Sequence, residues 1–128
     1  MKAHVILYVA DQHRATAFYS SVLGLGPSLD VPGITEFELG AGAVLGLMPE
    51  SGIRRLLSGA IADAPDANGS LRAELYLVVS DPGAYHERAL AAGAEPLSPL
   101  QLRDWGHRVA YSRDPDGYVL AFAAESTA

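Results

Sequence analysis

Cysteine is absent from the 128 residues of this chain, and its absence removes several kinds of chemistry. Disulfide bonds, zinc sites built on thiolates and cysteine nucleophiles are all excluded. A chain without disulfides suits a reducing compartment, and no signal peptide is visible before the first hydrophobic strand. We therefore expect a cytoplasmic protein.

Positive charge is also scarce. Nine lysine and arginine residues stand against fifteen aspartate and glutamate residues, which gives a net charge of −6. No basic stripe is present to neutralise phosphates, so nucleic acid is excluded as a partner. The longest apolar runs are far shorter than a membrane span, so no membrane partner is expected either. The acidic balance suits a neutral or cationic small molecule as the ligand.

The chain contains an internal repeat. HVILYVAD at 4–11 matches ELYLVVSD at 74–81 at a constant offset of 70, and each copy is followed by a helical pattern that ends at a glycine. Halves of about 60 residues are too short to bury a sufficient core alone, so we expect both to belong to one domain, 1–128. The predicted parts are a module at 1–61, a linker at 62–70 and a module at 71–128.

Hydrophobic periodicity predicts the same order of elements in each module. Alternation over 2–9 indicates a strand with one aliphatic face, which a helix can cover, and one mixed face. Asp11 and Asp81 are positioned to cap helices that end at Gly24 and Gly93. Further strands are predicted over 34–39, 43–49, 107–112 and 118–124, and a short helix over 54–61.

The four histidines differ in their expected surroundings. His4 lies on the mixed face of the first strand, where it is a candidate site residue. His13 and His86 fall near the polar faces of predicted helices, so both are expected to be solvated. His107 begins a predicted strand next to Trp105, which makes it a second candidate for a functional role.

Three segments together carry a resemblance to a known family. They are AFYSSVLGLG at 17–26, ELYLVVSD at 74–81 and WGHRVAYSRDPDGYVLAF at 105–122, of which the DPDG turn and its following strand are the most specific. In these segments the chain resembles the vicinal oxygen chelate superfamily, which includes glyoxalase I, extradiol dioxygenases, fosfomycin-resistance proteins and bleomycin-resistance proteins. The resemblance implies an α+β fold of two βαβββ modules, whose curved mixed sheets enclose a cleft, and a homodimer.

The resemblance also implies where metal ligands would lie. In metal-dependent members they come from the first and last strands of each module, at positions that correspond here to His4, Gly46, Glu74 and Ala121. Neither Gly46 nor Ala121 has a ligating side chain, and a catalytic divalent ion needs about three protein ligands. We therefore expect no metal cofactor and predict that His4 and Glu74 form a charge-assisted hydrogen bond across the cleft. Two alternatives stay open: the pair holds a zinc, nickel, manganese or iron ion weakly, or neither side chain has a specific role.

Small residues at the two vacant positions predict a roomy cleft with an apolar floor. Gly46 and Ala121 are expected to widen it, and Tyr8 and Tyr76, interpreted as equivalent residues of the two repeats, are expected to form aromatic walls. Trp105 is expected at the rim. The complete predicted cleft consists of His4, Ile6, Tyr8, Gly46, Met48, Glu74, Tyr76, Trp105, His107 and Ala121.

These features favour a metal-free protein that binds a hydrophobic or cationic small molecule, such as an antibiotic or a metabolite, over an enzyme. The alternative is a divalent-metal-dependent lyase, isomerase or thiol transferase of the glyoxalase I or fosfomycin-resistance type, with His107 or water as a further ligand. A third hypothesis is catalysis without metal, in which Glu74 is the base and His4 is its partner.

Overall fold

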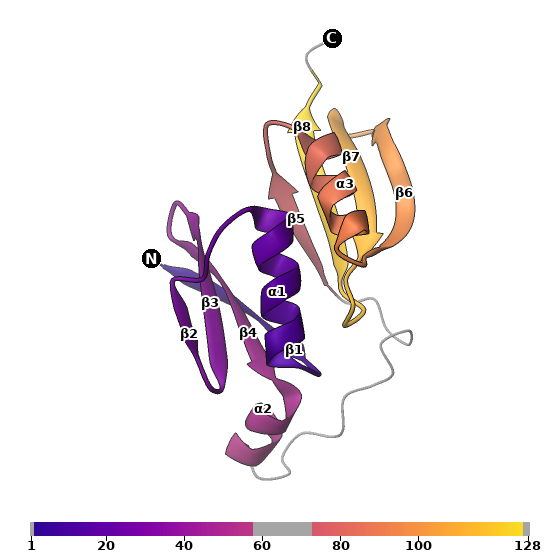
Figure 1. Ribbon diagram of the computed structural model, residues 1–128. Coiled ribbons are helices and arrows are strands. Elements are labelled where there is room, and N and C mark those ends of the chain that lie inside the picture. The colour runs from indigo at the N-terminus through magenta and orange to yellow at the C-terminus, as the bar shows by residue number, and fades with distance from the viewer. Residues whose placement is uncertain (1, 58–72, 127–128) are drawn as a thin grey trace. The chain divides into compact units, whose positions relative to one another are not determined.

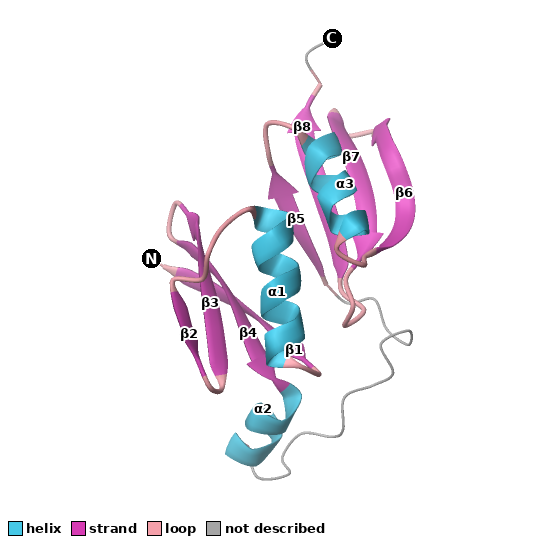
Figure 2. Cartoon of the chain, in the orientation of Figure 1, coloured by secondary structure: helices cyan, strands magenta, loops and turns pink. Residues whose placement is uncertain are grey.

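The computed structural model describes residues 2–57 and 73–126, which form strands and helices in alternating groups (Figure 1, Figure 2). In chain order the elements are β1 (Ala3–Val9), α1 (Gln12–Leu23), β2 (Leu29–Val31), β3 (Ile34–Gly40), β4 (Ala43–Pro49), α2 (Glu50–Leu56), β5 (Glu74–Val78), α3 (Pro82–Ala91), β6 (Glu95–Leu102), β7 (His107–Arg113) and β8 (Val119–Glu125). No helix within these two ranges is long and apolar enough to cross a membrane.

Contacts divide the chain into two compact units, Met1–Pro65 and Asp66–Ala128, which we call the first unit and the second unit. Their sheets have the orders β1-β4-β3-β2 and β5-β8-β7-β6. In each sheet the first strand pairs in parallel with the last, and the other pairs are antiparallel. The predicted α+β class and the two βαβββ modules are therefore confirmed. The predicted linker 62–70 and the end of the helix predicted over 54–61 lie outside the described residues.

Both long helices begin at the aspartates that the sequence predicts. The side chain of Asp11 accepts a hydrogen bond from the Arg14 backbone N–H at 3.0 Å, and that of Asp81 accepts one from Ala84 at 3.1 Å. The hydrogen bond from Arg14 is also the main reason why the pKa of Asp11 is lowered. α1 stops at Gly24, whose φ of 66° is in the left-handed region that favours glycine.

Each of these helices covers one face of its own sheet (Figure 1). Phe18 of α1 and Leu47 of β4 are buried in the first unit. In the second unit, the Tyr85 ring of α3 lies 5.7 Å from the Phe122 ring of β8, measured between centroids. Because side chains alternate along a strand, the neighbours of Leu47 and Phe122 point away from the helices. The predicted aliphatic face of β1 is covered only in part, since Val5 is 50% exposed.

The turn between β7 and β8 forms as the sequence predicts. Asp114 is 4% exposed, and its carboxylate accepts hydrogen bonds from the backbone N–H groups of Asp116 at 2.9 Å and Tyr118 at 2.8 Å. Gly117 has a φ of 95°, which few other residues tolerate. The turn thus joins the two strands that form the centre of the second sheet.

Two edge strands and one helix differ from the predictions. β2 has three exposed residues and gives no periodic signal. β6 contains Pro96 and Pro99, which argue against a strand except at an edge, and β6 is the edge of its sheet. The short helix predicted over 54–61 is α2, which begins earlier, at Glu50, because it follows directly on Pro49 at the end of β4.

The expectation that His86 is solvated is wrong. His86 is 8% exposed and belongs, with Pro82 and Ala89, to the buried side of α3. Polar residues on both sides in the sequence concealed this, because one histidine in a buried stripe does not change the hydrophobic pattern of a short helix. Burial disfavours the charged imidazole and lowers the pKa of His86. His13 is exposed, as expected.

Candidate functional site

The register of the parallel strand pairs shows which positions of the two units are equivalent. Ile6 pairs with Gly46 in the first unit, and Tyr76 pairs with Ala121 in the second. The predicted equivalence of Gly46 and Ala121 is therefore confirmed. The predicted equivalence of Tyr8 and Tyr76 is wrong, because Tyr76 takes the place of Ile6. An offset of two residues preserves the direction of a side chain, so the tyrosines share a face but not a position.

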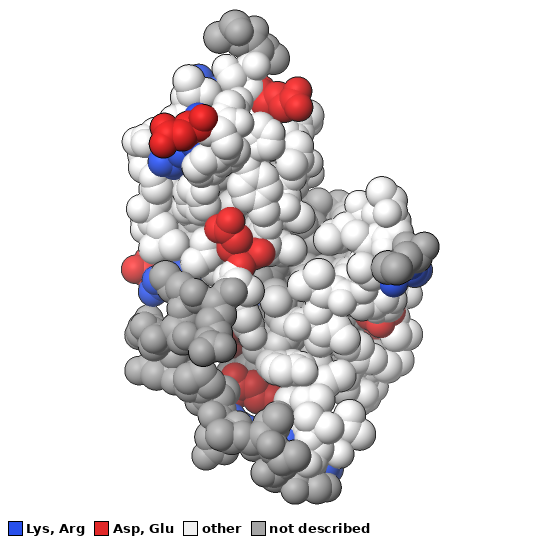
Figure 3. All heavy atoms as spheres, turned by 180° about the vertical axis from the view of Figure 1, so that it is seen from behind, with Lys and Arg blue, Asp and Glu red and all other residues white. Residues whose placement is uncertain are grey.

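We call the side of each sheet that points away from its helix the open face. The register places the following side chains on the open face of the first unit: His4, Ile6, Tyr8, Ile34, Glu36, Val44, Gly46 and Met48. The corresponding list for the second unit is Glu74, Tyr76, Val109, Tyr111, Val119, Ala121 and Ala123. In the view of Figure 3 most of the described surface of each unit is uncharged, and the acidic and basic side chains form small separate groups.

His4 has a carboxylate neighbour within its own unit that the sequence analysis missed. Its Nδ1 lies 3.4 Å from an oxygen of Glu36, and both side chains are only partly exposed. Glu36 pairs with Gly46, so it lies on the strand beside the vacant ligand position. The alternation of Ile34 and Glu36 with Thr35 and Phe37 is the sequence signal that would have found it. The predicted pairing of His4 with Glu74 joins the two units and stays a prediction.

The space next to Gly46 is filled by aliphatic side chains. A Cβ added to Gly46 would lie 3.1 Å from Cγ1 of Ile6 and 3.6 Å from Cδ1 of Ile34. The glycine therefore gives no empty volume within its unit, because two isoleucines close over it. A methyl group at Gly46 would force Ile6 to move by a few tenths of an ångström.

In the second unit three aromatic side chains form a hydrogen-bonded group. Trp105 Nε1 donates to the Tyr76 hydroxyl at 2.9 Å, and that hydroxyl lies 2.6 Å from Nδ1 of His107. The Tyr76 and His107 rings are stacked, with centroids 5.9 Å apart. Since indole can only donate, the hydroxyl hydrogen is available to a neutral His107 that carries its proton on Nε2. The group holds Trp105 in place although this residue is 57% exposed.

The aromatic group adjoins small apolar side chains. Val109, Ala121 and Ala123 form a buried cluster against which Tyr76 and Tyr111 pack. Tyr111 pairs with Ala121 and so takes the position that Glu36 has in the first unit. Because Val109, Ala121 and Ala123 are fully buried, the tyrosine rings and not the small residues form the surface here. The predicted apolar floor of a cleft stays a prediction.

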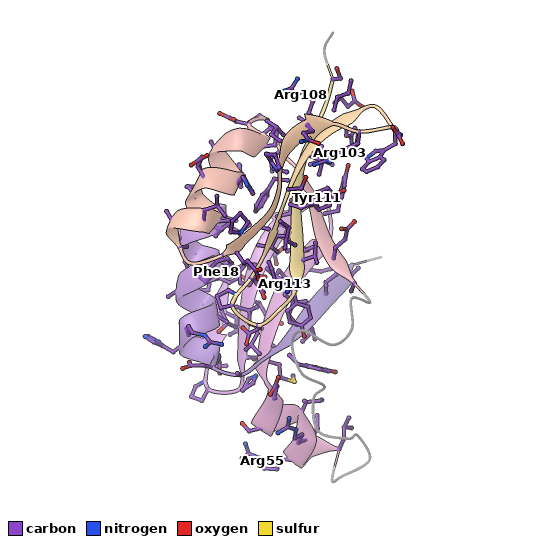
Figure 4. All side chains as sticks on the ribbon, turned by 90° about the vertical axis from the view of Figure 1, so that its right-hand side faces the viewer. Phe18, Arg55, Arg103, Arg108, Tyr111 and Arg113 are labelled. Carbon is purple, nitrogen blue, oxygen red and sulfur yellow. The ribbon has the colours of Figure 1, made fainter. Side chains whose placement is uncertain are left out.

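Arg103 supports the ring of Tyr111 from the end of β6. Its guanidinium carbon lies 5.1 Å from the centroid of the Tyr111 ring, and the two side chains are close in Figure 4. The same guanidinium donates to the Val109 carbonyl at 2.8 Å and to Ser98 Oγ at 2.9 Å. Desolvation, and then the negative charge of Glu74, raises the pKa of Tyr111, which therefore stays neutral at physiological pH. Tyr111 acts as a neutral aromatic surface and not as a base.

A family model described as the Glyoxalase/Bleomycin resistance protein/Dioxygenase superfamily matches residues 3–122. The chain belongs to this superfamily. The resemblance carried by the DPDG turn and by the repeated strand is therefore confirmed. No curated protein is significantly similar to this member of the superfamily in sequence.

Several solved structures of the superfamily are similar to this chain. A glyoxalase-related enzyme from Fulvimarina pelagi is 25% identical with a TM-score of 0.81, and the match covers 98% of this chain and 88% of that one. A glyoxalase/bleomycin resistance protein/dioxygenase from Nocardioides is 26% identical with a TM-score of 0.77, over 99% and 84%. A glyoxalase/bleomycin resistance protein from Albidiferax ferrireducens T118 is 25% identical with a TM-score of 0.72, over 96% and 97%.

The donors described within either unit alone are too few to fix a catalytic metal ion. His4 and Glu36 give two donors on the first open face, whereas Glu74 is the counterpart of His4 on the second. Within residues 2–57 and 73–126, no group of three or more histidine, aspartate or glutamate side chains could hold a metal ion. Two protein donors leave the geometry of a divalent ion undetermined, so we derive no chemistry through a metal.

The predicted cleft residues fall into two sets in this superfamily member. Tyr76, Trp105, His107 and Ala121 come together on the second unit, as does Glu74 at the start of β5. The set on the first unit consists of His4, Ile6, Tyr8, Gly46 and Met48. The sequence analysis missed Glu36, Tyr111 and Arg103. Tyr111 alternates with buried residues in a predicted strand, whereas Arg103 lies in an edge strand that gave no signal.

Proposed function

We propose that this protein binds a planar hydrophobic or cationic small molecule on the aromatic open face of the second unit, without a metal ion. The observation that carries the proposal is the indole of Trp105, which is 57% exposed and yet fixed by its hydrogen bond to Tyr76. An exposed indole that is already hydrogen-bonded to the protein loses less conformational entropy than a free side chain when a ligand stacks on it. Binding is therefore favoured over a role as an ordinary surface residue.

The charges of this face support a cation over an anion. Glu74 is exposed at the start of β5 and raises the pKa of the nearby Tyr111, so its negative field reaches this ring. Two arginines of this face are engaged elsewhere. Arg103 donates to Ser98, Pro99 and Val109, and Arg113, which the register places on the same face, lies 3.7 Å from a Glu95 carboxylate oxygen. Electron-rich tyrosine and tryptophan rings attract cations further.

The single tryptophan gives a direct test. We expect 9-aminoacridine, a planar cation, to quench the Trp105 fluorescence saturably and more strongly than the anionic acridine-9-carboxylate. Calorimetry should show that Trp105→Ala weakens binding of 9-aminoacridine by about tenfold. Glu74→Gln should remove the preference for the cation while leaving neutral acridine unaffected. Equal affinity for both charged probes, or an unchanged affinity in Trp105→Ala, would contradict the proposal.

A metal-dependent lyase, isomerase or thiol transferase is the second candidate, favoured by the 3.4 Å contact of His4 and Glu36. Titration of zinc, nickel, manganese and iron(II) into untagged protein, followed by the melting temperature, distinguishes this metal-dependent enzyme from the metal-free binding protein. Stoichiometric metal that is lost in His4→Ala, Glu36→Ala or Glu74→Ala would overturn the metal-free proposal. Metal-independent binding of 9-aminoacridine would support it, because a ligand specific to the folded state raises the melting temperature.

We also propose that the protein is a cytoplasmic homodimer, as the superfamily resemblance implies. The edge strands β1 and β5 each expose apolar side chains, such as Val5 and Val78, which supports association at a strand edge. Light scattering at increasing protein concentration should give twice the mass of the chain. A monomer mass at every concentration would contradict the dimer and would leave the ligand proposal unaffected.

A further inference from the structure

The second unit has a hollow on the helix-covered side of its sheet, opposite to the open face. It lies between α3 and β6 and has a volume of about 410 Å³, which suits a small organic molecule. The helix contributes Gly83, His86 and Leu90 to its lining, and the strand contributes Pro96, Pro99 and Leu100. The lining is therefore mainly aliphatic.

The hollow exists because β6 departs from a regular strand. Its pairing with β7 shifts register between Pro96 and Ser98 and again between Ser98 and Gln101, and the strand bows at the edge of the sheet (Figure 1). Arg103 holds the bowed segment by donating to Ser98 Oγ at 2.9 Å and to the Pro99 carbonyl at 3.0 Å. The equivalent edge strand of the first unit, β2, has only three residues and cannot form such a wall.

His86 is a polar group at this hollow without a complete set of partners. The residue is 8% exposed, and its Nδ1 is buried without a hydrogen-bond partner among the described residues. The equivalent position on α1 is Thr16, five residues after the helix cap in both units. The Thr16 hydroxyl donates to Thr35 at 2.9 Å. The second unit therefore leaves unpaired a position that the first unit satisfies, which costs free energy unless another molecule supplies the bond.

A second unpaired polar atom lies on the same side of the sheet. Ser112 Oγ is fully buried without a partner among the described residues, and Ser112 pairs with Pro96, a lining residue of the hollow. Desolvation lowers the pKa of His86, so the imidazole is neutral at physiological pH. A neutral imidazole offers one donor and one acceptor, and a hydroxyl group matches either because it can donate and accept.

We propose that this hollow is a second ligand site, which takes a compact apolar molecule bearing one hydroxyl group, such as a phenol or a short-chain alcohol, with His86 as the polar anchor. The aliphatic lining holds the hydrocarbon part, and the imidazole pairs with the hydroxyl. Glu87 also lines the hollow and disfavours anions there.

The test compares p-cresol with toluene, which lacks only the hydroxyl group, by NMR titration of the full chain with ¹⁵N-labelled histidine. We expect p-cresol to shift the His86 ring nitrogens and to bind about threefold to tenfold more tightly than toluene. Calorimetry, which does not depend on the His86 signal, should show that His86→Phe abolishes this preference. Equal binding of the two probes to the unaltered protein, or the absence of any saturable shift, would overturn the proposal.

Two further variants test whether p-cresol binds in the hollow or on the open face. A Cβ at Gly83 would meet atoms no nearer than 3.6 Å, so Gly83→Leu can fill the hollow without a backbone clash. We expect Gly83→Leu to abolish p-cresol binding while the dispersion of the NMR spectrum shows a folded protein. Trp105→Ala, which removes the aromatic group of the open face, should leave the His86 shifts in place. Loss of these shifts in Trp105→Ala, or their persistence in Gly83→Leu, would assign p-cresol to the other face and refute the second site.

Discussion

The open faces of the two units share one backbone plan and carry opposite side-chain chemistry. In the first unit Ile6 closes over Gly46 beside Glu36, and in the second Tyr76 and Tyr111 stand over Ala121. The strand order and the parallel pairing are the same in both. Backbone hydrogen bonds fix the positions of the Cβ atoms, whereas the side chains alone decide whether a face is filled, charged or aromatic. A duplicated scaffold thus keeps its register while its two faces diverge.

Truncation of the two cores is the strongest way to test whether the units act as one domain. Leu47 and Phe122 occupy equivalent strand positions and are fully buried. Leu47→Ala should lower the free energy of unfolding by about 2–5 kcal/mol and Phe122→Ala by about 3–5 kcal/mol. In urea unfolding, circular dichroism reports both units and Trp105 fluorescence reports the second. We expect Leu47→Ala to shift both signals together. Separate transitions would contradict the single domain predicted from the sequence.

Addition of a methyl group at Gly46 tests whether this position is packed more tightly than the equivalent Ala121. Gly46→Ala should cost about 0–2 kcal/mol, because Ile6 must move away from a Cβ that would lie 3.1 Å from its Cγ1, whereas alanine regains about 0.5–1 kcal/mol of backbone entropy. Ile6→Ala removes that atom, so the double variant should be more stable than the sum of the single effects predicts. The reverse exchange, Ala121→Gly, should cost about 0.5–1 kcal/mol from backbone entropy. Additive effects of Gly46→Ala and Ile6→Ala in urea unfolding would refute the packing described for Gly46.

Removal of one hydroxyl tests whether the aromatic group of the second unit is held by hydrogen bonds. Tyr76→Phe deprives both Trp105 and His107 of a partner and should lower the free energy of unfolding by about 0.5–1.5 kcal/mol. It should also change the emission of Trp105. Tyr111→Phe is the matched control, since it removes a hydroxyl from the same face and leaves this group intact. An equal change of emission in both variants would show that the hydrogen bonds do not position the indole.

The pH dependence of stability should distinguish α3 from α1, because α3 buries a histidine where α1 has Thr16. The folded-state pKa of His86 lies below the unfolded value of about 6.5, so the unfolded chain binds this proton first as the pH falls. The contribution of His86 to stability is therefore complete above pH ~6.5 and declines as the pH falls toward the folded-state pKa. Melting temperatures between pH 7 and pH 5 should fall less in His86→Gln than in the unaltered protein. His13→Gln, at an exposed position, should not have this effect.

The smallest effect is expected from the ion pair of the first open face. His4 and Glu36 are partly exposed, so His4→Gln or Glu36→Gln should change the free energy of unfolding by about 0.5 kcal/mol. A double-mutant cycle in urea measures their coupling. A coupling free energy well above about 0.5 kcal/mol would mean that the pair is shielded from water, and would favour a functional role for it.

The fold followed from local signals in the sequence. Asp11 and Asp81 mark the helix starts, and Gly117 marks the turn before β8, because caps and turns depend on a few neighbouring residues. The edge strands β2 and β6 escaped prediction, since an edge strand tolerates exposed residues and proline. The candidate site was predicted in part: Trp105 and His107 were named, but the hydroxyl of Tyr76 that joins them depends on a contact between distant strands.

The duplicated βαβββ plan, the superfamily and the two vacant metal-ligand positions could all be read from the amino-acid sequence, because each rests on periodicity, local motifs and residue identity. The neighbours of those two positions became known from the folded chain: Ile6 and Ile34 at Gly46, and Tyr76 and Tyr111 at Ala121. The burial of His86 likewise follows only from the folded chain. The physical reason is that alternation along a strand specifies which face a side chain points to, whereas its neighbours on that face come from other strands and depend on register and packing.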